Sequence, residues 1–273
     1  MREQSELPAE PLVRHNGPQS IIPVAISNNL SFSDIGRALA AGWRDFKGAP
    51  AFGLFFAAFY VIGGAAIVYA LSTLGEVWWL IPAMAGFPLF APFAAVGLYE
   101  VSRRREAGLP LSWRAVLGAL RGHDNDQLMM MGGIVFIAFG IWLGLAHGIF
   151  AIFLGESGIG ATSIAQLMSP EGMMMLAVGG AIGAIFAFGL YAITVMSLPM
   201  LVERDVDFIT AIIVSLAVIK KNKSVMIAWA LLIAIILGLA LIPAFLGLFA
   251  ALPILGHATW HIYRRATSPL LPE

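Results

Sequence analysis

The chain has 273 residues, of which 59% are hydrophobic and 12% charged, and its mean hydropathy is +0.86. A soluble globular domain is usually about a quarter charged, so this composition predicts a polytopic membrane protein. The formal net charge is zero, which leaves no basic field for nucleic acid. The chain has no cysteine, so disulfides and cysteine-ligated metal centres are excluded.

The N-terminal residues differ in composition from the rest of the chain. Residues 7–23 contain four prolines, and acidic residues precede the first apolar run. Such a segment buries too little apolar surface to fold, so we predict that residues 1–30 are a disordered cytoplasmic arm. Residues 31–265 are predicted to form the membrane domain, and residues 266–273 a cytoplasmic tail.

Six segments approach or exceed the roughly 20 apolar residues that a helix needs to cross a bilayer. They are residues 50–71, 77–100, 127–154, 172–201, 224–242 and 245–263. The last two could form one long helix, but Pro243 and Gly247 interrupt the apolar run. We therefore predict an all-α protein with six transmembrane helices arranged as three hairpins.

The distribution of charge gives this map an orientation. All sixteen Lys and Arg residues fall in residues 2–47, 103–121, 204–223 or 264–265, and the other three connections contain none. Cytoplasmic connections carry the excess of Lys and Arg in membrane proteins. The sequence therefore predicts an inner-membrane protein with both termini in the cytoplasm.

Each cytoplasmic approach to a hairpin carries a short amphipathic segment. In residues 34–47, Leu39, Trp43 and Phe46 share a helical face, and residues 112–121 and 207–219 have similar patterns. Such helices bury an apolar face at headgroup level and offer cations to anionic lipid. We predict three parallel repeats of such a helix plus a hairpin, at about residues 33–101, 112–201 and 207–265.

Two predicted spans carry glycines at helical spacing. Gly140, Gly144 and Gly148 lie on the third span, and Gly179 and Gly183 lie on the fourth. Glycine permits close backbone approach between helices in lipid. We expect these glycines to pack the second hairpin, with a homo-oligomer seam as the alternative.

Three histidines lie within predicted spans. His257 and His261 are spaced i, i+4 near the inner end of the sixth span, and His147 lies in the third. Imidazoles inside a membrane are costly and suggest function, so haem or metal binding by His257 with His147 is one interpretation. A structural hydrogen-bonding role is the other, because no metal-ligand cluster accompanies them. We predict no metal site and no cofactor.

Charged residues of both signs gather at the predicted cytoplasmic ends of spans two and four. One interpretation is helix-end anchoring by local ion pairs, each worth less than about 1 kcal/mol when exposed. The alternative is a rim that docks a partner. The candidate interaction rim consists of Glu100, Arg103, Arg104, Glu203, Arg204, Asp205 and Asp207.

Three segments carry a resemblance to a known family. They are Gly42-Trp-Arg-Asp-Phe-Lys-Gly-Ala-Pro50, Ser197-Leu-Pro-Met-Leu-Val-Glu-Arg-Asp-Val-Asp207 and Gly256-His-Ala-Thr-Trp-His-Ile-Tyr-Arg264. These segments resemble motifs of a set of predicted bacterial integral membrane proteins, domain of unknown function 2189, and the resemblance spans about residues 30–265. It implies a membrane location and brings no established activity.

The sequence supports three functional hypotheses. No P-loop, Gly-x-Ser-x-Gly or zincin motif occurs, so we predict no catalytic residues and favour a non-enzymatic subunit, assembly factor or lipid-associated scaffold. Its expected partners are the lipid bilayer and another membrane protein or a second copy. The second hypothesis is a small-solute carrier or channel with a midplane site near His257, and the third is the haem or metal protein.

Overall fold

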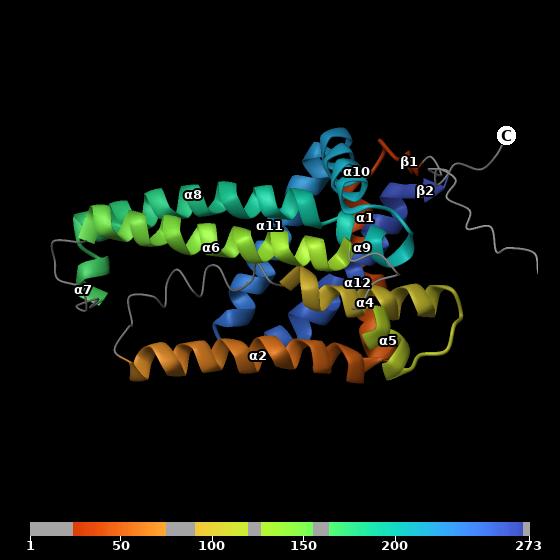
Figure 1. Ribbon diagram of the computed structural model, residues 1–273, viewed down its shortest axis with the longest axis horizontal. Coiled ribbons are helices and arrows are strands. Elements are labelled where there is room, and N and C mark those ends of the chain that lie inside the picture. Colours follow the sequence, from red (N-terminus) through yellow and green to blue (C-terminus); the bar gives the residue numbers. More distant parts are fainter. Residues whose placement is uncertain (1–23, 75–90, 120–126, 155–163, 270–273) are drawn as a thin grey trace, which may run out of the picture.

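The structure is a computed structural model, and it describes residues 24–74, 91–119, 127–154 and 164–269. These residues are mainly helical (Figure 1). The helices are α1 (Phe32–Gly48), α2 (Pro50–Thr73), α4 (Ala91–Glu106), α5 (Trp113–Ala119), α6 (Gln127–Leu154), α7 (Ile164–Leu167), α8 (Pro170–Thr194), α9 (Ser197–Glu203), α10 (Phe208–Lys221), α11 (Lys223–Leu241) and α12 (Leu248–Ala266), and the strands are β1 (Val24–Ile26) and β2 (Thr267–Pro269).

Four helical stretches are long and apolar enough to cross a membrane. They are Pro50–Thr73, Gln127–Leu154, Pro170–Glu203 and Lys223–Leu241, and they coincide with the first, third, fourth and fifth predicted spans. A helix of 24 residues is about 36 Å long, so α2 exceeds the hydrocarbon core of about 30 Å.

The other two predicted spans have a different outcome. The second is described only from Ala91 onward, where α4 continues to Glu106, and residues 77–90 lie outside the described residues. The sixth is helical as α12 but is not among the stretches that qualify as spans. The break between α11 and α12 is confirmed, and Ala244 and Phe245 in the turn have positive φ values of 49° and 68°. Six spans therefore remain a proposal.

Helix α12 is the central helix of the described structure. Most of its residues are buried, and it packs against α1, α2, α4 and α11. Small residues make these contacts close. A Cβ on Gly42 of α1 would lie 2.6 Å from the Ile254 carbonyl oxygen, and one on Gly256 would lie 2.6 Å from Leu98 of α4. The backbones of these helices therefore approach each other with no room for a larger side chain.

Helix α1 is amphipathic as predicted, and a face of small and acidic residues packs it on the protein. The buried residues are Asp34, Ile35, Ala38, Gly42 and Asp45, whereas Trp43 is 44% exposed. The small residues allow α1 to lie directly on α12, where Asp34 reaches Arg265 and Asp45 reaches His261. The predicted helices at 112–121 and 207–219 form as α5 and α10, and Arg121 lies outside the described residues.

Helices α6 and α8 form a separate pair that joins the rest through α9 and α10. Trp142 of α6 lies over Gly183 of α8, where an added Cβ would be 2.8 Å from its ring. Within the described residues, no atom lies within 4 Å of a Cβ placed on Gly140, Gly144 or Gly148. The expectation of packing within the second hairpin is therefore confirmed for α8 and wrong for α6.

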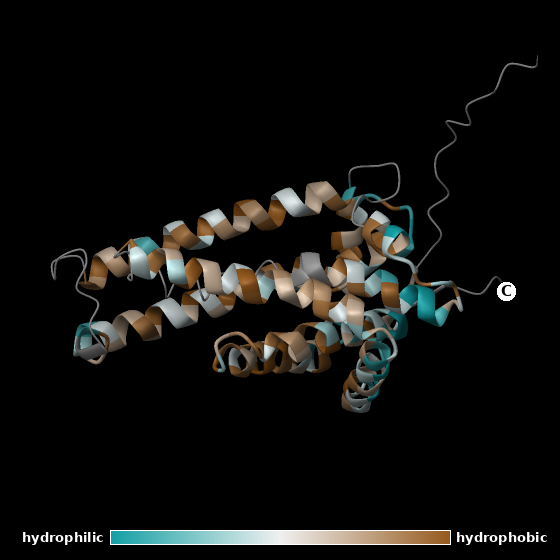
Figure 2. Cartoon of the chain, turned by 90° about the horizontal axis from the view of Figure 1, so that it is seen from below, coloured by the Kyte–Doolittle hydropathy of each residue, from teal (hydrophilic) through white to brown (hydrophobic). Residues whose placement is uncertain are grey.

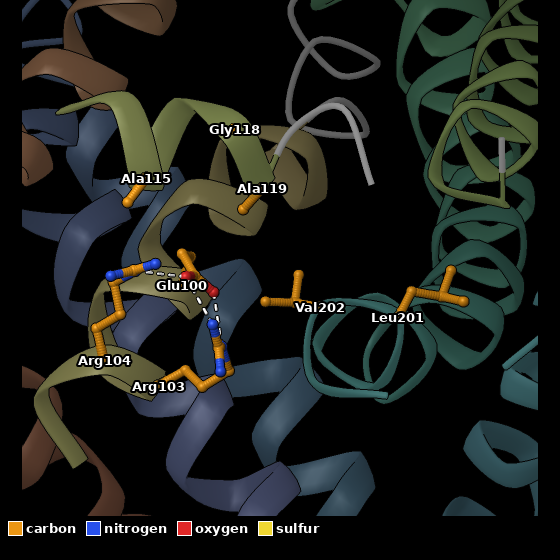
Figure 3. Close-up of a pocket in the computed structure, with 8 residues that line it drawn as sticks. All are labelled: Glu100, Arg103, Arg104, Ala115, Gly118, Ala119, Leu201 and Val202. Atoms are coloured by element: carbon orange, nitrogen blue, oxygen red, sulfur yellow. Dashed lines mark hydrogen bonds and ion pairs between the residues drawn. The ribbon is translucent and has the colours of Figure 1, made fainter. Parts of the chain in front are cut away.

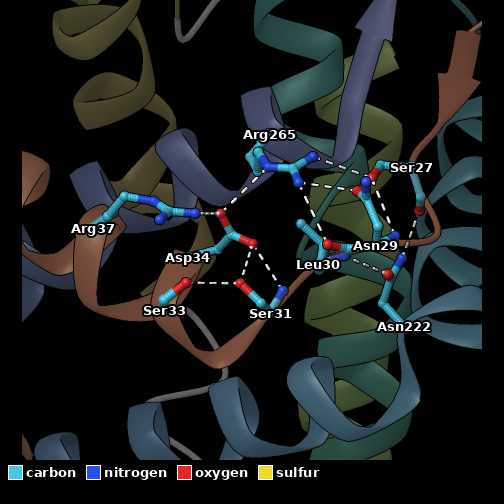
Figure 4. A network of polar contacts seen from close by, with 9 residues as sticks. All are labelled: Ser27, Asn29, Leu30, Ser31, Ser33, Asp34, Arg37, Asn222 and Arg265. Carbon is cyan, nitrogen blue, oxygen red and sulfur yellow. Dashed lines mark hydrogen bonds and ion pairs between the residues drawn. The ribbon is translucent and has the colours of Figure 1, made fainter.

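The two ends of the described chain are tied together. Strand β1 pairs antiparallel with β2, with Val24 opposite Pro269 and Ile26 opposite Thr267. The Asn222 side chain accepts from the Leu30 amide at 3.1 Å, and Arg265 donates to the Asn29 side chain at 3.0 Å (Figure 4). Residues 24–30 thus contact the rest of the chain; residues 1–23 lie outside the described residues, and the boundary of the arm stays a prediction.

Polarity is distributed unevenly along the molecule. Figure 2 shows mostly hydrophobic colour along the long helices and a concentration of hydrophilic colour at the end that carries the C-terminus. Large apolar side chains are exposed on the long helices, among them Phe59, Phe136, Ile185 and Leu231. Lipid would cover such side chains, as expected for a membrane protein.

Candidate functional site

The three segments at residues 42–50, 197–207 and 256–264 converge at the hydrophilic end of the molecule. Asp45 of α1 accepts from His261 of α12, and Glu203 of α9 accepts from Tyr263 of α12. Helix α4 adds Ser102, which donates to Asp45, and Glu106, which accepts from Trp260. We call the assembly the polar cluster; it comprises Asp45, Ser102, Arg105, Glu106, Glu203, Arg204, His257, Trp260, His261, Tyr263 and Arg264.

Asp45 is the hub of one half of the polar cluster. Its Oδ2 accepts from Ser102 Oγ at 2.7 Å and from His261 Nε2 at 2.8 Å, and its Oδ1 accepts from Arg105 Nε at 2.9 Å. Ser102 Oγ also lies 2.8 Å from His257 Nδ1. Five side chains from α1, α4 and α12 thus share one hydrogen-bonded network.

The chemistry of the groups assigns the protons in this network. An ionised carboxylate only accepts, so the Ser102 hydroxyl donates to Asp45. The Ser102 oxygen then accepts from His257, which places the His257 proton on Nδ1. Nε2 of that ring makes no hydrogen bond to the described residues. A bare nitrogen without a proton is the less costly atom to leave there, because no N–H donor goes unsatisfied.

Asp45 is held in its charged form. Burial works against the carboxylate, but the hydrogen bonds from His261, Ser102 and Arg105 outweigh it and lower the pKa of Asp45 well below its usual range. Arg105 also lies against Gly48 at the C-terminal end of α1, where an added Cβ would overlap its guanidinium. A cation at that end of a helix is favoured by the helix dipole.

Glu203 and Glu106 organise the other half of the polar cluster. Tyr263 donates to Glu203 at 2.5 Å, and Trp260 Nε1 donates to Glu106 at 2.9 Å. Arg264 donates to both carboxylates and so joins α12 to α4 and α9. Partial burial opposes its charge, but Glu203 and Glu106 together raise the pKa of Arg264 above its ordinary value.

A cavity of about 180 Å³ lies beside the polar cluster, between α4, α5 and α9 (Figure 3). Glu100 on its wall accepts from Arg103 at 2.7 and 2.8 Å and from Arg104 at 2.6 Å. Arg104 also donates to the Pro110 carbonyl at 2.9 Å. We call this cavity the arginine pocket; it is lined by Glu100, Arg103, Arg104, Ala115, Gly118, Ala119, Leu201 and Val202.

The structure divides the candidate interaction rim into three places. Glu100, Arg103 and Arg104 line the arginine pocket, and Glu203 and Arg204 belong to the polar cluster. Asp207 caps α10 by accepting from the Thr210 amide at 2.8 Å, and Asp205 lies between α9 and α10. Local ion pairs are therefore confirmed for most of the rim, and its use as a docking site stays a prediction.

The three candidate histidines do not come together. His257 is fully buried and is linked to His261 through Ser102 and Asp45. His147 is exposed on α6, which packs mainly against α8 rather than α12. In the described part of the chain, no group of three or more His, Asp or Glu residues could hold a metal ion. The geometry therefore favours the hydrogen-bonding role for His257 over ligation with His147.

Several residues of the polar cluster were not predicted as site residues, among them Asp45, Ser102, Glu106 and Trp260. Asp45 and Trp260 lie within two of the segments that carried the family resemblance, so those segments held the signal. The sequence contained no signal for Ser102 or Glu106, because a single serine or glutamate at the end of an apolar run is common. Only the tertiary contacts reveal their partners.

Four long apolar helices joined at a polar end define a polytopic helical membrane protein. The family model for predicted integral membrane proteins, domain of unknown function 2189, matches residues 80–203. The resemblance to that family is confirmed there, whereas residues 42–50 and 256–264 lie outside the match. No curated protein and no solved structure matches the chain.

Proposed function

We propose that this protein is a non-enzymatic component of the bacterial inner membrane, acting as a subunit, assembly factor or lipid-associated scaffold. Its chain crosses the bilayer six times as three hairpins, with both termini in the cytoplasm. The one-sided distribution of the sixteen Lys and Arg residues supports this orientation. The hydrophilic end of the molecule is then the cytoplasmic end.

The closed construction of the polar cluster is the observation that carries the proposal. Its carboxylates accept from side chains on neighbouring helices, and Ser102 is 0% exposed. A catalytic group must come within hydrogen-bonding distance of a substrate, which a sealed hydroxyl does not allow. The order Asp45–Ser102–His257 also differs from a catalytic triad, in which the histidine lies between the other two. These side chains join four helices instead.

The outward face of α1 is the surface we assign to a partner. Trp43 is 44% exposed, Lys47 lies 5.4 Å from the centre of its ring, and Arg44 is exposed beside them. Tryptophan and arginine are enriched among the residues that carry binding energy at protein interfaces. Because the opposite face of α1 is fixed to α12, this surface is presented rigidly.

Purification in a mild detergent, followed by mass spectrometry, tests the partner. We expect one membrane protein to co-purify in stoichiometric amount with the wild type and to be lost from Trp43→Ala. Phe32→Ala is the matched control, since Phe32 is a more exposed aromatic residue at the start of the same helix, at 63%. Wild-type protein that runs alone after gentle extraction, with no reproducible companion, would contradict a subunit or scaffold role.

The topology makes a separate prediction. A reporter that is active only in the cytoplasm should work when fused after residue 273, and a periplasmic reporter should work when inserted at residues 155–163. The physical reason is that no Lys or Arg lies between residues 122 and 203. A periplasmic signal from the C-terminal fusion would overturn the six-span map.

A further inference from the structure

The arginine pocket exposes cationic groups above a buried anion. The Glu100 side chain is 4% exposed, whereas the side chains of Arg103 and Arg104 are 29% and 20% exposed. Two guanidiniums share one carboxylate, so the three groups carry a net charge of about +1. The accessible part of the trio is therefore positive, although it contains a glutamate.

Donors remain for a ligand after these internal bonds are made. Arg103 uses Nε and Nη2 for Glu100, and Arg104 uses Nε for Glu100 and Nη1 for Pro110. A guanidinium has five N–H groups. Nη1 of Arg103 and Nη2 of Arg104 make no hydrogen bond to the described residues. Each of these nitrogens therefore has two N–H groups to offer to a ligand.

The opposite wall of the pocket is built from small residues of α5. Ala115, Gly118 and Ala119 line it, and no described atom lies within 4 Å of a Cβ placed on Gly118. The cavity of about 180 Å³ has room for several water molecules. This space suits a headgroup-sized anion and is too small for an acyl chain.

The outer surface of α5 connects the pocket to lipid. Trp113 is 42% exposed and Leu117 is 36% exposed, and Arg114 is exposed between them. A short helix with apolar, aromatic and cationic residues of this kind lies at the membrane interface. A ligand in the arginine pocket would therefore be beside the headgroup layer.

We propose that the arginine pocket binds the phosphate of an anionic lipid headgroup through the guanidinium groups of Arg103 and Arg104. Guanidinium groups match phosphate oxygens in charge and geometry. This inference rests on the proposed function only in placing this end of the molecule at the inner membrane surface. It does not require a protein partner.

The test measures lipid binding by purified, delipidated protein in detergent. Phosphatidylglycerol and phosphatidylcholine are titrated separately, and bound lipid is counted by native mass spectrometry. We expect phosphatidylglycerol to bind at least about tenfold more tightly, because the neutral headgroup pairs its own phosphate with an ammonium. The preference should weaken as salt is raised from low to physiological concentration, since salt screens the partly exposed guanidiniums.

Gly118→Leu fills the pocket without altering its charges. Its side chain enters open space, and leucine has a higher helix propensity than glycine, so the fold should be retained while phosphatidylglycerol binding falls at least about tenfold. Gly36→Leu is the matched control, because Gly36 also lies in a helix with nothing near its Cβ position and is distant from the pocket lining. It should bind as the wild type does.

Glu100→Gln should change the affinity for phosphatidylglycerol in the opposite direction, that is, raise it. It keeps a hydrogen-bond acceptor under the two arginines but removes the negative charge, so phosphatidylglycerol should bind several-fold more tightly. If Glu100, Arg103 and Arg104 only stabilised the fold, removing the charge of Glu100 would not raise the affinity for phosphatidylglycerol. Circular dichroism confirms that each variant is folded before binding is compared.

Three results would overturn the inference. One is equal binding of the two lipids by the wild type, and another is unchanged phosphatidylglycerol binding in Gly118→Leu. The third is displacement of phosphatidylglycerol by millimolar inorganic phosphate, which would identify a site for a soluble anion. Wild-type protein that co-purifies with no partner but keeps its lipid selectivity would contradict the subunit or scaffold role alone.

Discussion

Gly42→Ala is expected to separate α1 from α12 and to destabilise the whole polar end of the molecule. The added Cβ would lie 2.6 Å from the Ile254 carbonyl oxygen and 2.7 Å from the Ala258 amide nitrogen. These are backbone atoms of the central helix, so they cannot rotate away. Overpacking of this kind costs about 1–3 kcal/mol or more. That cost exceeds the gain of about 1 kcal/mol from replacing glycine by alanine in a helix.

A second glycine in α1 provides the control for that prediction. Gly36 has nothing within 4 Å of its Cβ position, so Gly36→Ala should keep the gain in helix propensity and raise stability slightly. The measurement is the midpoint of unfolding in detergent, followed by circular dichroism. The two variants should differ by about 2 kcal/mol or more. Equal midpoints would show that α1 does not rest on α12 at Gly42.

The buried face of α1 shows where reasoning from the sequence is limited. The pattern of Leu39, Trp43 and Phe46 correctly predicted an amphipathic helix with an apolar face for the headgroup layer, but it did not identify the face that packs on α12. In a membrane protein, apolar side chains can face lipid, while small residues permit close helix contact. Polar groups are satisfied inside the protein. Gly42 and Asp45 therefore face inward, and Trp43 faces outward.

Hydropathy located the long helices well and described α12 poorly. The segments of α2, α6 and α11 agree with the predicted spans to within two residues at each end, because each is apolar throughout. Helix α12 carries His257, Thr259 and Tyr263, which its neighbours bury, and His261, which they cover in part. Tertiary contacts decide whether helices or lipid cover such polar groups. Hydropathy alone does not predict these contacts.

The polar cluster could be predicted only in part for the same reason. Asp45 and His261 are 216 positions apart, and Glu106 and Trp260 are 154 apart. Single residues gave no indication of these pairings. The local ion pairs of Glu100 with Arg103 and Arg104 could be predicted, because partners three and four residues apart on one helix can be read from spacing.

Asp45→Asn is expected to be the most destabilising single substitution in the polar cluster. Asparagine keeps the shape of the side chain but removes the charge, which leaves Arg105 without its counter-ion and weakens the hydrogen bond to His261. Removing one partner of a buried ion pair costs about 3–5 kcal/mol. Arg105 is 32% exposed, so solvent screening reduces its share and the lower end of that range applies. Denaturant unfolding in detergent measures the loss.

The pH dependence of stability distinguishes the charge of Asp45 from its shape. The pKa of Asp45 is lowered in the folded protein from an ordinary value of 3.8, so its ionisation stabilises the fold above that value. This contribution is lost progressively as the pH falls below about 4. Asp34 behaves in the same sense, because its hydrogen bonds outweigh burial and lower its pKa to about 2. Wild-type stability should therefore fall progressively from about pH 4 to pH 2 and below.

Asp45→Asn should flatten this acid profile, since the substituted side chain does not titrate and only Asp34 and other carboxylates still contribute. Asp207→Asn is the control. Asp207 also has a lowered pKa, but it is the exposed N-cap of α10, where asparagine serves about as well as aspartate, so Asp207→Asn should change stability little and leave the Asp45 contribution in place. If Asp45→Asn kept the wild-type acid profile, the carboxylate would not be the charged centre that joins α1, α4 and α12. The stability of this end would then depend on side-chain packing alone.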